Sequence, residues 1–177
     1  LSKNHDIAPD TSLKTLFVED AQGGLVALVL RGDQQLNEIK AEKISGISQP
    51  LRMAQESAVR TATGASFGSL GPVGLDVRIV VDRAASVLTN FVCGANEDGK
   101  HLKGVNWQRD IPKFEVADLR TVSAGDPSPC GTGQLEIKRG IEVGHIFRVS
   151  LLEPFKAGHS AEAHGLLPAW TPARGPR

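Results

Sequence analysis

Residues 25–30 read Leu-Val-Ala-Leu-Val-Leu, a continuous apolar run that decides the fold of this chain. A strand with one wet face alternates apolar and polar residues, whereas a strand covered on both faces is apolar throughout. The run is far shorter than the ~20 apolar residues that cross a membrane. It therefore predicts an inner strand of a sheet that is covered on both sides.

The segments around this run predict helices and strands in mixed order. Helices are expected at residues 34–44, capped by Asp33 and closed by Gly46, and at residues 54–63, closed by Gly64. Residues 94–99, Gly-Ala-Asn-Glu-Asp-Gly, have the composition of a hairpin turn. Strands are expected at residues 15–18, 25–30, 77–81, 87–93, 100–107, 114–122, 135–137 and 143–149. This order predicts an α/β fold of the mixed, α+β-like kind, with a compact, mostly antiparallel mixed sheet flanked by helices.

The patterned sequence ends near residue 149, and a segment rich in Pro, Ala, Gly and His follows. Because that segment has no hydrophobic period, we expect residues 150–177 to form a disordered or non-native tail. The predicted organisation is one domain over residues 1–149 and a tail over residues 150–177.

Composition excludes several classes of function. The chain of 177 residues has 20 Lys and Arg against 20 Asp and Glu, so no global positive field indicates a nucleic-acid binder, and any RNA contact would be local. The cysteines, Cys93 and Cys130, form no CxxC pair and fit a reducing compartment. No leader-like start and no membrane-length apolar run is present, so we expect a cytoplasmic location without a membrane partner. Neither a metal site with zinc spacing nor a Gly-x-Ser-x-Gly nucleophile is found.

Lys40 is the first candidate for chemistry. It follows Leu36 by four residues and so borders the apolar stripe of the expected first helix, closer to its centre than Lys43. The side chain can extend its stem over apolar surface and keep its amine in water. Alternatively, it can enter a pocket as a compact cation for an anionic or carbonyl group. The stripe consists of Leu36, Ile39, Ile44 and Ile47.

Two glycine-containing loops are further candidates. Residues 68–72, Gly-Ser-Leu-Gly-Pro, lack the Lys-Ser/Thr ending of a phosphate-binding P-loop. Their glycines would let the backbone approach a ligand, and free N–H groups could hold a carboxylate, phosphate or carbonyl oxygen. The turn at residues 94–99 could do the same. For both loops a purely structural turn is the alternative.

Two other segments contain functional residue types. Residues 100–109 are basic with one tryptophan, so they could contact a phosphate or stack a base, or simply form a solvated strand edge. Residues 140–147, Gly-Ile-Glu-Val-Gly-His-Ile-Phe, hold an acid and a histidine between apolar residues. His145 could be a base or could make a structural hydrogen bond.

Taken in order over about residues 13–149, these segments resemble the insertion (editing) domain of bacterial-type prolyl-tRNA synthetase, within the YbaK-like aminoacyl-tRNA deacylase family. Each run alone is modest, but their order is specific. The runs are residues 29–33, 36–43, 68–73, 94–96, 98–101, 106–110, 115–120, 125–129 and 138–147.

The resemblance implies that the chain is an aminoacyl-tRNA deacylase. Such an enzyme hydrolyses the ester between proline tRNA and a wrong amino acid, chiefly alanine. A synthetase pocket rejects a smaller amino acid poorly, since a missing methylene is worth only ~1–3 kcal/mol, so a second site must edit. The implied partners are the charged acceptor end of proline tRNA and the rest of the synthetase. Editing needs no cofactor, because ATP is used only by the synthetic core, whose segments are missing from this sequence.

The resemblance also implies site residues. Lys40 would position the amino acid or the terminal adenosine by charge, and water, oriented by backbone groups and the tRNA ribose hydroxyl, would attack the ester. Asp126 and His145 match positions near the pocket. The substrate loop would contain Gly68, Ser69, Leu70, Gly71 and Pro72, and the facing wall Gly94 and Ala95.

Departures from the family keep two other interpretations open. Residues 148–152 do not continue into a synthetase core, and the helix usual ahead of Pro9 is missing. The chain could instead be a freestanding trans-acting aminoacyl-tRNA deacylase, or a non-catalytic tRNA-binding module. Residues 138–147 favour the insertion domain, because a freestanding enzyme has no need to return to a synthetase body.

Overall fold

The computed structural model of the chain describes residues 8–140. The chain divides into two compact units, Leu1–Ile137 and Lys138–Arg177, and the fold described below is that of the first unit. The expected strand at residues 143–149, His145 and the expected tail at residues 150–177 lie outside the described residues.

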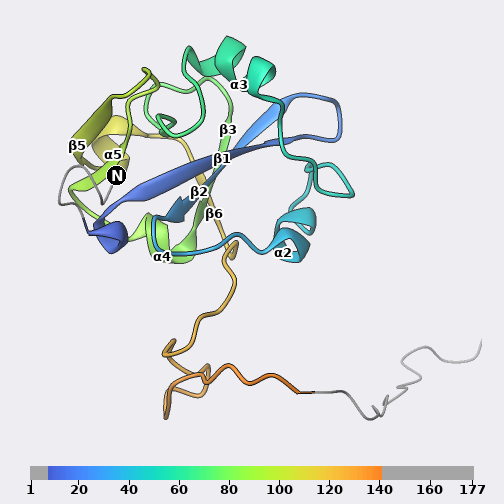
Figure 1. Cartoon of the computed structure of the whole chain (residues 1–177), viewed down its shortest axis with the longest axis vertical. Helices are drawn as coiled ribbons and strands as arrows, with labels where there is room; N and C mark the ends of the chain where they lie inside the picture. The colour runs from blue at the N-terminus through green and yellow to red at the C-terminus, as the bar shows by residue number, and fades with distance from the viewer. Residues whose placement is uncertain (1–7, 141–177) are drawn as a thin grey trace, which may run out of the picture. The chain divides into compact units, whose positions relative to one another are not determined.

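The central strand is where the apolar run predicts it. Strand β2 (Leu25–Arg31) has five consecutive buried residues between two half-buried ends. It pairs antiparallel with β1 (Leu13–Glu19) and parallel with β3 (Arg78–Asp82), which in turn pairs parallel with β6 (Glu115–Ala117). The resulting sheet has the order β1-β2-β3-β6 and leaves β1 at one edge (Figure 1).

Each face of this sheet carries its own hydrophobic cluster, which is why β2 is apolar throughout. On one face Ala27 and Val29 join a cluster that includes Val59 of α3 (Glu56–Thr63) and Trp107 of α5 (Trp107–Asp110). On the other face the strand packs against Ala41 of α2 (Glu38–Glu42). That second cluster holds Val18, Val26, Leu28, Leu30, Ala41, Ile47, Val80 and Leu119.

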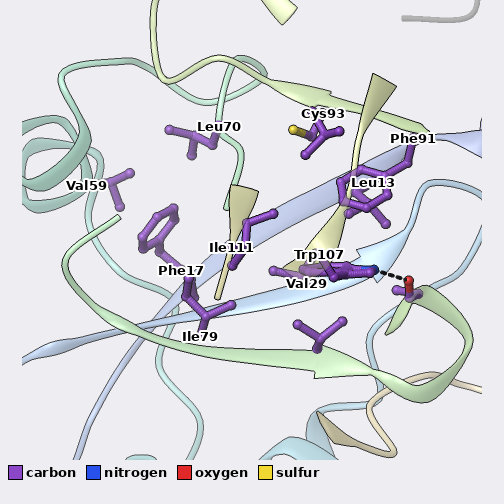
Figure 2. Close-up of a cluster of buried hydrophobic side chains, with 14 of the residues drawn as sticks. Leu13, Phe17, Val29, Val59, Leu70, Ile79, Phe91, Cys93, Trp107 and Ile111 are labelled. Carbon is purple, nitrogen blue, oxygen red and sulfur yellow. Dashed lines mark hydrogen bonds between the residues drawn. The ribbon is translucent and has the colours of Figure 1, made fainter. Parts of the chain in front are cut away.

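A second sheet covers the first face. Strands β4 (Phe91–Gly94) and β5 (His101–Val105) pair antiparallel, so the predicted hairpin around residues 94–99 is confirmed. Trp107 packs against Phe91 and Phe114 with ring centroids 4.9 and 4.8 Å away. Its indole N–H donates a 3.0 Å hydrogen bond to the carbonyl of Ala85 in α4 (Arg83–Ser86), as Figure 2 shows. The buried indole therefore has its polar atom satisfied.

The predicted helix at residues 34–44 is wrong in its first half. The helix begins at Glu38, where the Asn37 side chain accepts a hydrogen bond from the backbone N–H of Lys40. Residues 35–37 instead form backbone hydrogen bonds with residues 119–121, which draws them out of the helix. Asp33 is not a cap but forms an ion pair with Arg31 at 2.7 Å. The predicted stripe is wrong at Ile39, which is 67% exposed, whereas Ile47 is buried in the second cluster. Leu36 and Ile44 also pack against that cluster.

The remaining differences are smaller. The mixed fold is confirmed, but the four-stranded sheet has one antiparallel and two parallel pairings, because β3 and β6 return through crossovers. Residues 87–90 are not strand, since α4 occupies residues 83–86 before them. Residues 135–137 are not strand either; Leu135 exchanges hydrogen bonds with the loop at residues 125–126. Within residues 8–140, no helix has the length and apolar content to traverse a bilayer.

Asp82 gives the first testable prediction. This carboxylate is 1% exposed; Oδ1 accepts the N–H of Ala84 at 2.8 Å, and Oδ2 accepts those of Leu119 at 2.9 Å and Arg120 at 3.2 Å. Asp82→Ala should lower the free energy of unfolding by about 3 kcal/mol, because it leaves buried N–H groups without an acceptor. Urea denaturation measures this.

Asp76 provides the control, because it is exposed. Asp76→Ala should change the free energy of unfolding by no more than about 0.5 kcal/mol. Equal effects of the two substitutions would contradict the structural role of Asp82.

The two cysteines give a second prediction. Burial, followed by the charge of Asp110, raises the pKa of Cys93 to about 12. Hydrogen bonds from the Ser128 and Thr132 hydroxyls lower the pKa of the exposed Cys130 to about 7. Because the thiolate is the reactive form, iodoacetamide at neutral pH should alkylate Cys130 in the native protein and Cys93 only after unfolding. Peptide mass spectrometry locates the alkylated cysteines. Alkylation of Cys93 in the native protein would contradict its burial.

Candidate functional site

A cavity of about 440 Å³ lies beside the edge strand β1. Its wall combines β1 with the segment before α3, the loop after α3 and the facing ends of β4 and β5. The lining residues are Leu13, Lys14, Thr15, Leu16, Phe17, Met53, Ala54, Phe67, Gly68, Leu70, Gly94 and His101.

The cavity has a buried apolar wall and an exposed apolar rim. Leu13, Phe17 and Leu70 belong to the main hydrophobic cluster and are buried. Met53 and Phe67 also line the cavity, yet they are 51% and 55% exposed. Concave, mostly apolar sites with a few polar groups are typical of small-ligand pockets.

At one wall of the cavity, Gly94 lets two loops pack backbone against backbone. A Cβ added to Gly71 would collide with the carbonyl of Gly94, and a Cβ on Gly94 would collide with the carbonyl of Ser69. No other residue type fits at either position without moving the opposite chain. The two predicted loops therefore touch one another.

Asn96 holds these loops together. Its side-chain oxygen accepts the N–H of Gly71 at 2.9 Å, and its amide donates to the carbonyls of Gly71 and Val73 at 3.1 and 2.9 Å. Its own N–H donates to the Ser69 carbonyl at 2.9 Å. Asn96 has a φ of 56°, in the left-handed region that asparagine tolerates better than most residues. Hydrogen bonds of Asn96 thus join the loop at residues 69–73 to the β4–β5 hairpin.

Asp98 anchors the loop from its outer side. One of its oxygens accepts the N–H of Ser66 at 2.7 Å, and the other accepts from Arg60 of α3 at 2.6 Å. Arg60 also donates to the Ser66 hydroxyl at 2.9 Å. The Ser66 N–H, together with the Arg60 charge, lowers the pKa of Asp98.

Lys14 is the basic side chain on β1 that lines the cavity. Burial lowers its pKa from 10.5, and the charge of Asp33 partly opposes this shift. The sequence prediction missed Lys14 because the expected strand began at residue 15. The sequence signal that could have included it is the apolar residue Leu13, which extends the strand pattern two residues before residue 15.

His101 also lines the cavity and was not among the predicted site residues. It pairs with Gly94 across the β4–β5 hairpin. The turn predicted at residues 94–99 would pair Cys93 with Lys100, so the sequence prediction did not place His101 beside Gly94.

Some of the predicted loop residues line the cavity, and the others contact those residues or continue their loops. Gly68, Leu70 and Gly94 line it. Ser69 and Gly71 are packed against Gly94, and the Ser69 hydroxyl accepts the N–H of Gly99 at 2.9 Å. Pro72 continues that loop, and Ala95 donates its N–H to the Lys100 carbonyl in the hairpin.

Lys40 and Asp126 are not among the residues that line the cavity. The Lys40 amine donates to both oxygens of Asp118 at 2.8 and 3.0 Å and to the Arg120 carbonyl at 2.9 Å. Asp126 forms an ion pair with Arg120, whose hydrogen bond lowers the pKa of Asp126. His145 lies outside the described residues. Within residues 8–140, no group of three or more His, Cys, Asp and Glu is placed to hold a metal ion.

Solved structures share this fold. The crystal structure of the hypothetical protein APE2540 is 26% identical, with a TM-score of 0.57 over 68% of this chain and 81% of that one. A structure described as that of a proposed trans-editing enzyme for prolyl tRNA synthetase is 21% identical, with a TM-score of 0.57 over 68% of this chain and 77% of that one. At that identity the second similarity concerns the fold alone.

A family model connects the fold and the cavity with an activity. The model described as the aminoacyl-tRNA editing domain matches residues 1–111. This range covers more than half of the chain and includes every residue that lines the cavity. The protein therefore belongs to the aminoacyl-tRNA editing domain family.

Proposed function

We propose that the chain is an aminoacyl-tRNA deacylase whose cavity beside β1 receives the amino acid of a mischarged tRNA. The observation that carries the proposal is the apolar cavity with Lys14 in its wall, within the residues matched by the editing-domain family. An apolar wall holds a short aliphatic side chain, and a backbone wall limits its length.

The proposed reaction is attack of water on the ester carbonyl. Among the described residues, the cavity lining contains no thiol, and its hydroxyl belongs to Thr15, which is buried. A positioned cation stabilises the negative charge that develops on the carbonyl oxygen. We assign this role to Lys14.

The finer substrate that we propose is proline tRNA charged with alanine. The series of sequence runs and the fold shared with a proposed trans-editing enzyme for prolyl tRNA synthetase support it. We also propose a cytoplasmic location, where charged tRNA is used.

The setting of the domain has two candidates. The order of the sequence runs, including residues 138–147, supports an insertion domain of prolyl-tRNA synthetase. The fold shared over 77% of a proposed trans-editing enzyme supports a freestanding deacylase. Hydrolysis of alanyl-tRNA by the isolated chain, with and without added synthetase, distinguishes them, since a freestanding enzyme needs no synthetase body.

A pair of lysine variants tests the site. Lys14→Ala should lower kcat/KM for deacylation of alanyl proline tRNA by about 100-fold, the loss caused by removing one charge-stabilising group. Lys40→Ala should leave kcat/KM within about twofold, because its amine is paired with Asp118. That pair is partly exposed, so its loss should cost no more than about 1 kcal/mol of folding stability.

The reverse result identifies Lys40 as the functional lysine and overturns the role of Lys14. No hydrolysis by the wild-type chain, with or without synthetase, would sink the deacylase proposal itself.

The lowered pKa of Lys14 predicts a pH dependence of binding. The ammonium form exists below the pKa, so affinity for a non-hydrolysable 3′-amide analogue of alanyl-adenosine should fall as pH rises through it. Because that pKa is below 10.5, the loss should begin at a lower pH than for an exposed lysine. Lys14→Arg should retain affinity over the same range, since arginine stays charged. Identical calorimetric titration curves for both proteins would contradict this role.

A further inference from the structure

Phe67 is an exposed aromatic side chain at a site where several other apolar residues are buried. It is 55% exposed while it lines the cavity, and Met53 at the same cavity is 51% exposed. By contrast, the adjacent wall residues Leu13 and Phe17 are almost fully buried. The cavity therefore has a second apolar surface, which faces solvent.

The backbone that carries Phe67 is fixed on both sides. The preceding Ser66 is bound to Asp98 through its N–H and to Arg60 through its hydroxyl. The following Gly68 has a φ of +96°, a conformation that a side chain would strain. The Ser69 N–H donates to the Ser66 carbonyl at 3.4 Å, which closes the turn. A rigid loop thus presents the ring to solvent, which lowers the entropy lost when a ligand covers it.

The proposed substrate supplies a flat group at this place. Its amino acid is esterified to the terminal ribose, so an amino acid inside the cavity fixes the ribose at the mouth and the terminal adenine beyond it. Exposed aromatic side chains bind unpaired bases by stacking, which every base can do through its π face. Met53 adds a polarizable, adaptable apolar contact.

We propose that Phe67 is the stacking platform for the terminal adenine of the tRNA acceptor end, with Met53 as the second apolar contact of that base. The proposal rests on the deacylase function and adds a binding surface for the nucleotide to the cavity for the amino acid. Phe67 is a positioning residue here, since it touches the base and not the reacting ester.

The test uses the whole chain and alanyl-tRNA. Phe67→Ala should raise KM by about 5- to 150-fold, the range for loss of one stacked base, and leave kcat within about twofold. Phe67→Trp should restore KM, whereas Phe67→Leu, apolar but not aromatic, should not. Val87→Ala is the matched control, because Val87 is exposed and is not part of the cavity lining.

A second arm removes the base instead of the ring. A substrate with an abasic terminal nucleotide should raise KM of the wild-type chain, and Phe67→Ala should add no further increase on that substrate. If removal of the base and Phe67→Ala each raised KM independently, so that their effects multiplied, the stacking role would be overturned. An unchanged KM for Phe67→Ala on the normal substrate would overturn it too. If the wild-type chain hydrolysed alanyl-tRNA no faster than the spontaneous rate, the proposed function itself would be refuted. The two failures are therefore distinguishable.

Discussion

The burial of β2 on both faces is the constraint on which the rest of the structure depends. A strand with five consecutive buried residues needs a cover on each side, and the two hydrophobic clusters supply it. Each buried methylene stabilises the folded state by about 0.8 kcal/mol. Burial of apolar side chains in these two clusters is therefore a large favourable contribution to the stability of the fold. Because β2 pairs with β1 on one side and β3 on the other, β1 becomes an edge strand of this sheet. Its outer side is bridged to Met53 at Val18, and the chain is bridged to Val92 at Ser12, so the edge is open between those two bridges.

The candidate site uses that open edge. Strand β1 supplies Lys14, and the loops that cover the first sheet face supply the opposite wall. Close contact between glycines does not by itself keep the two loops together, because the glycines allow the backbones to approach but form no side-chain hydrogen bonds. Asn96 and Asp98 provide the binding through side-chain hydrogen bonds to backbone groups. The core thus sets where the cavity lies, and two polar residues of one hairpin hold the loop that lines it.

The sequence predicted the parts of the fold that depend on local pattern. The apolar run of β2, the β4–β5 hairpin, and Gly64 after α3 follow from hydrophobic period and turn chemistry. The helix at residues 34–44 could not be bounded in this way, because residues 35–37 pair with residues 119–121, which are distant in sequence. The same kind of distant contact pairs Lys40 with Asp118, and sequence spacing cannot reveal it. The glycine loops were predicted as candidates from composition, but their mutual contact required the tertiary structure.

The interlocked wall has an evolutionary consequence. A surface formed by carbonyl and amide groups is the same whatever side chains its neighbours carry, so drift at those positions cannot retune which amino acid is accepted. Changes of selectivity would have to arise where side chains form the surface, at residues such as Leu13, Met53 and Leu70. The domain therefore separates backbone positions that are fixed during divergence from side-chain positions that are adaptable, and libraries made to alter its selectivity should vary the second.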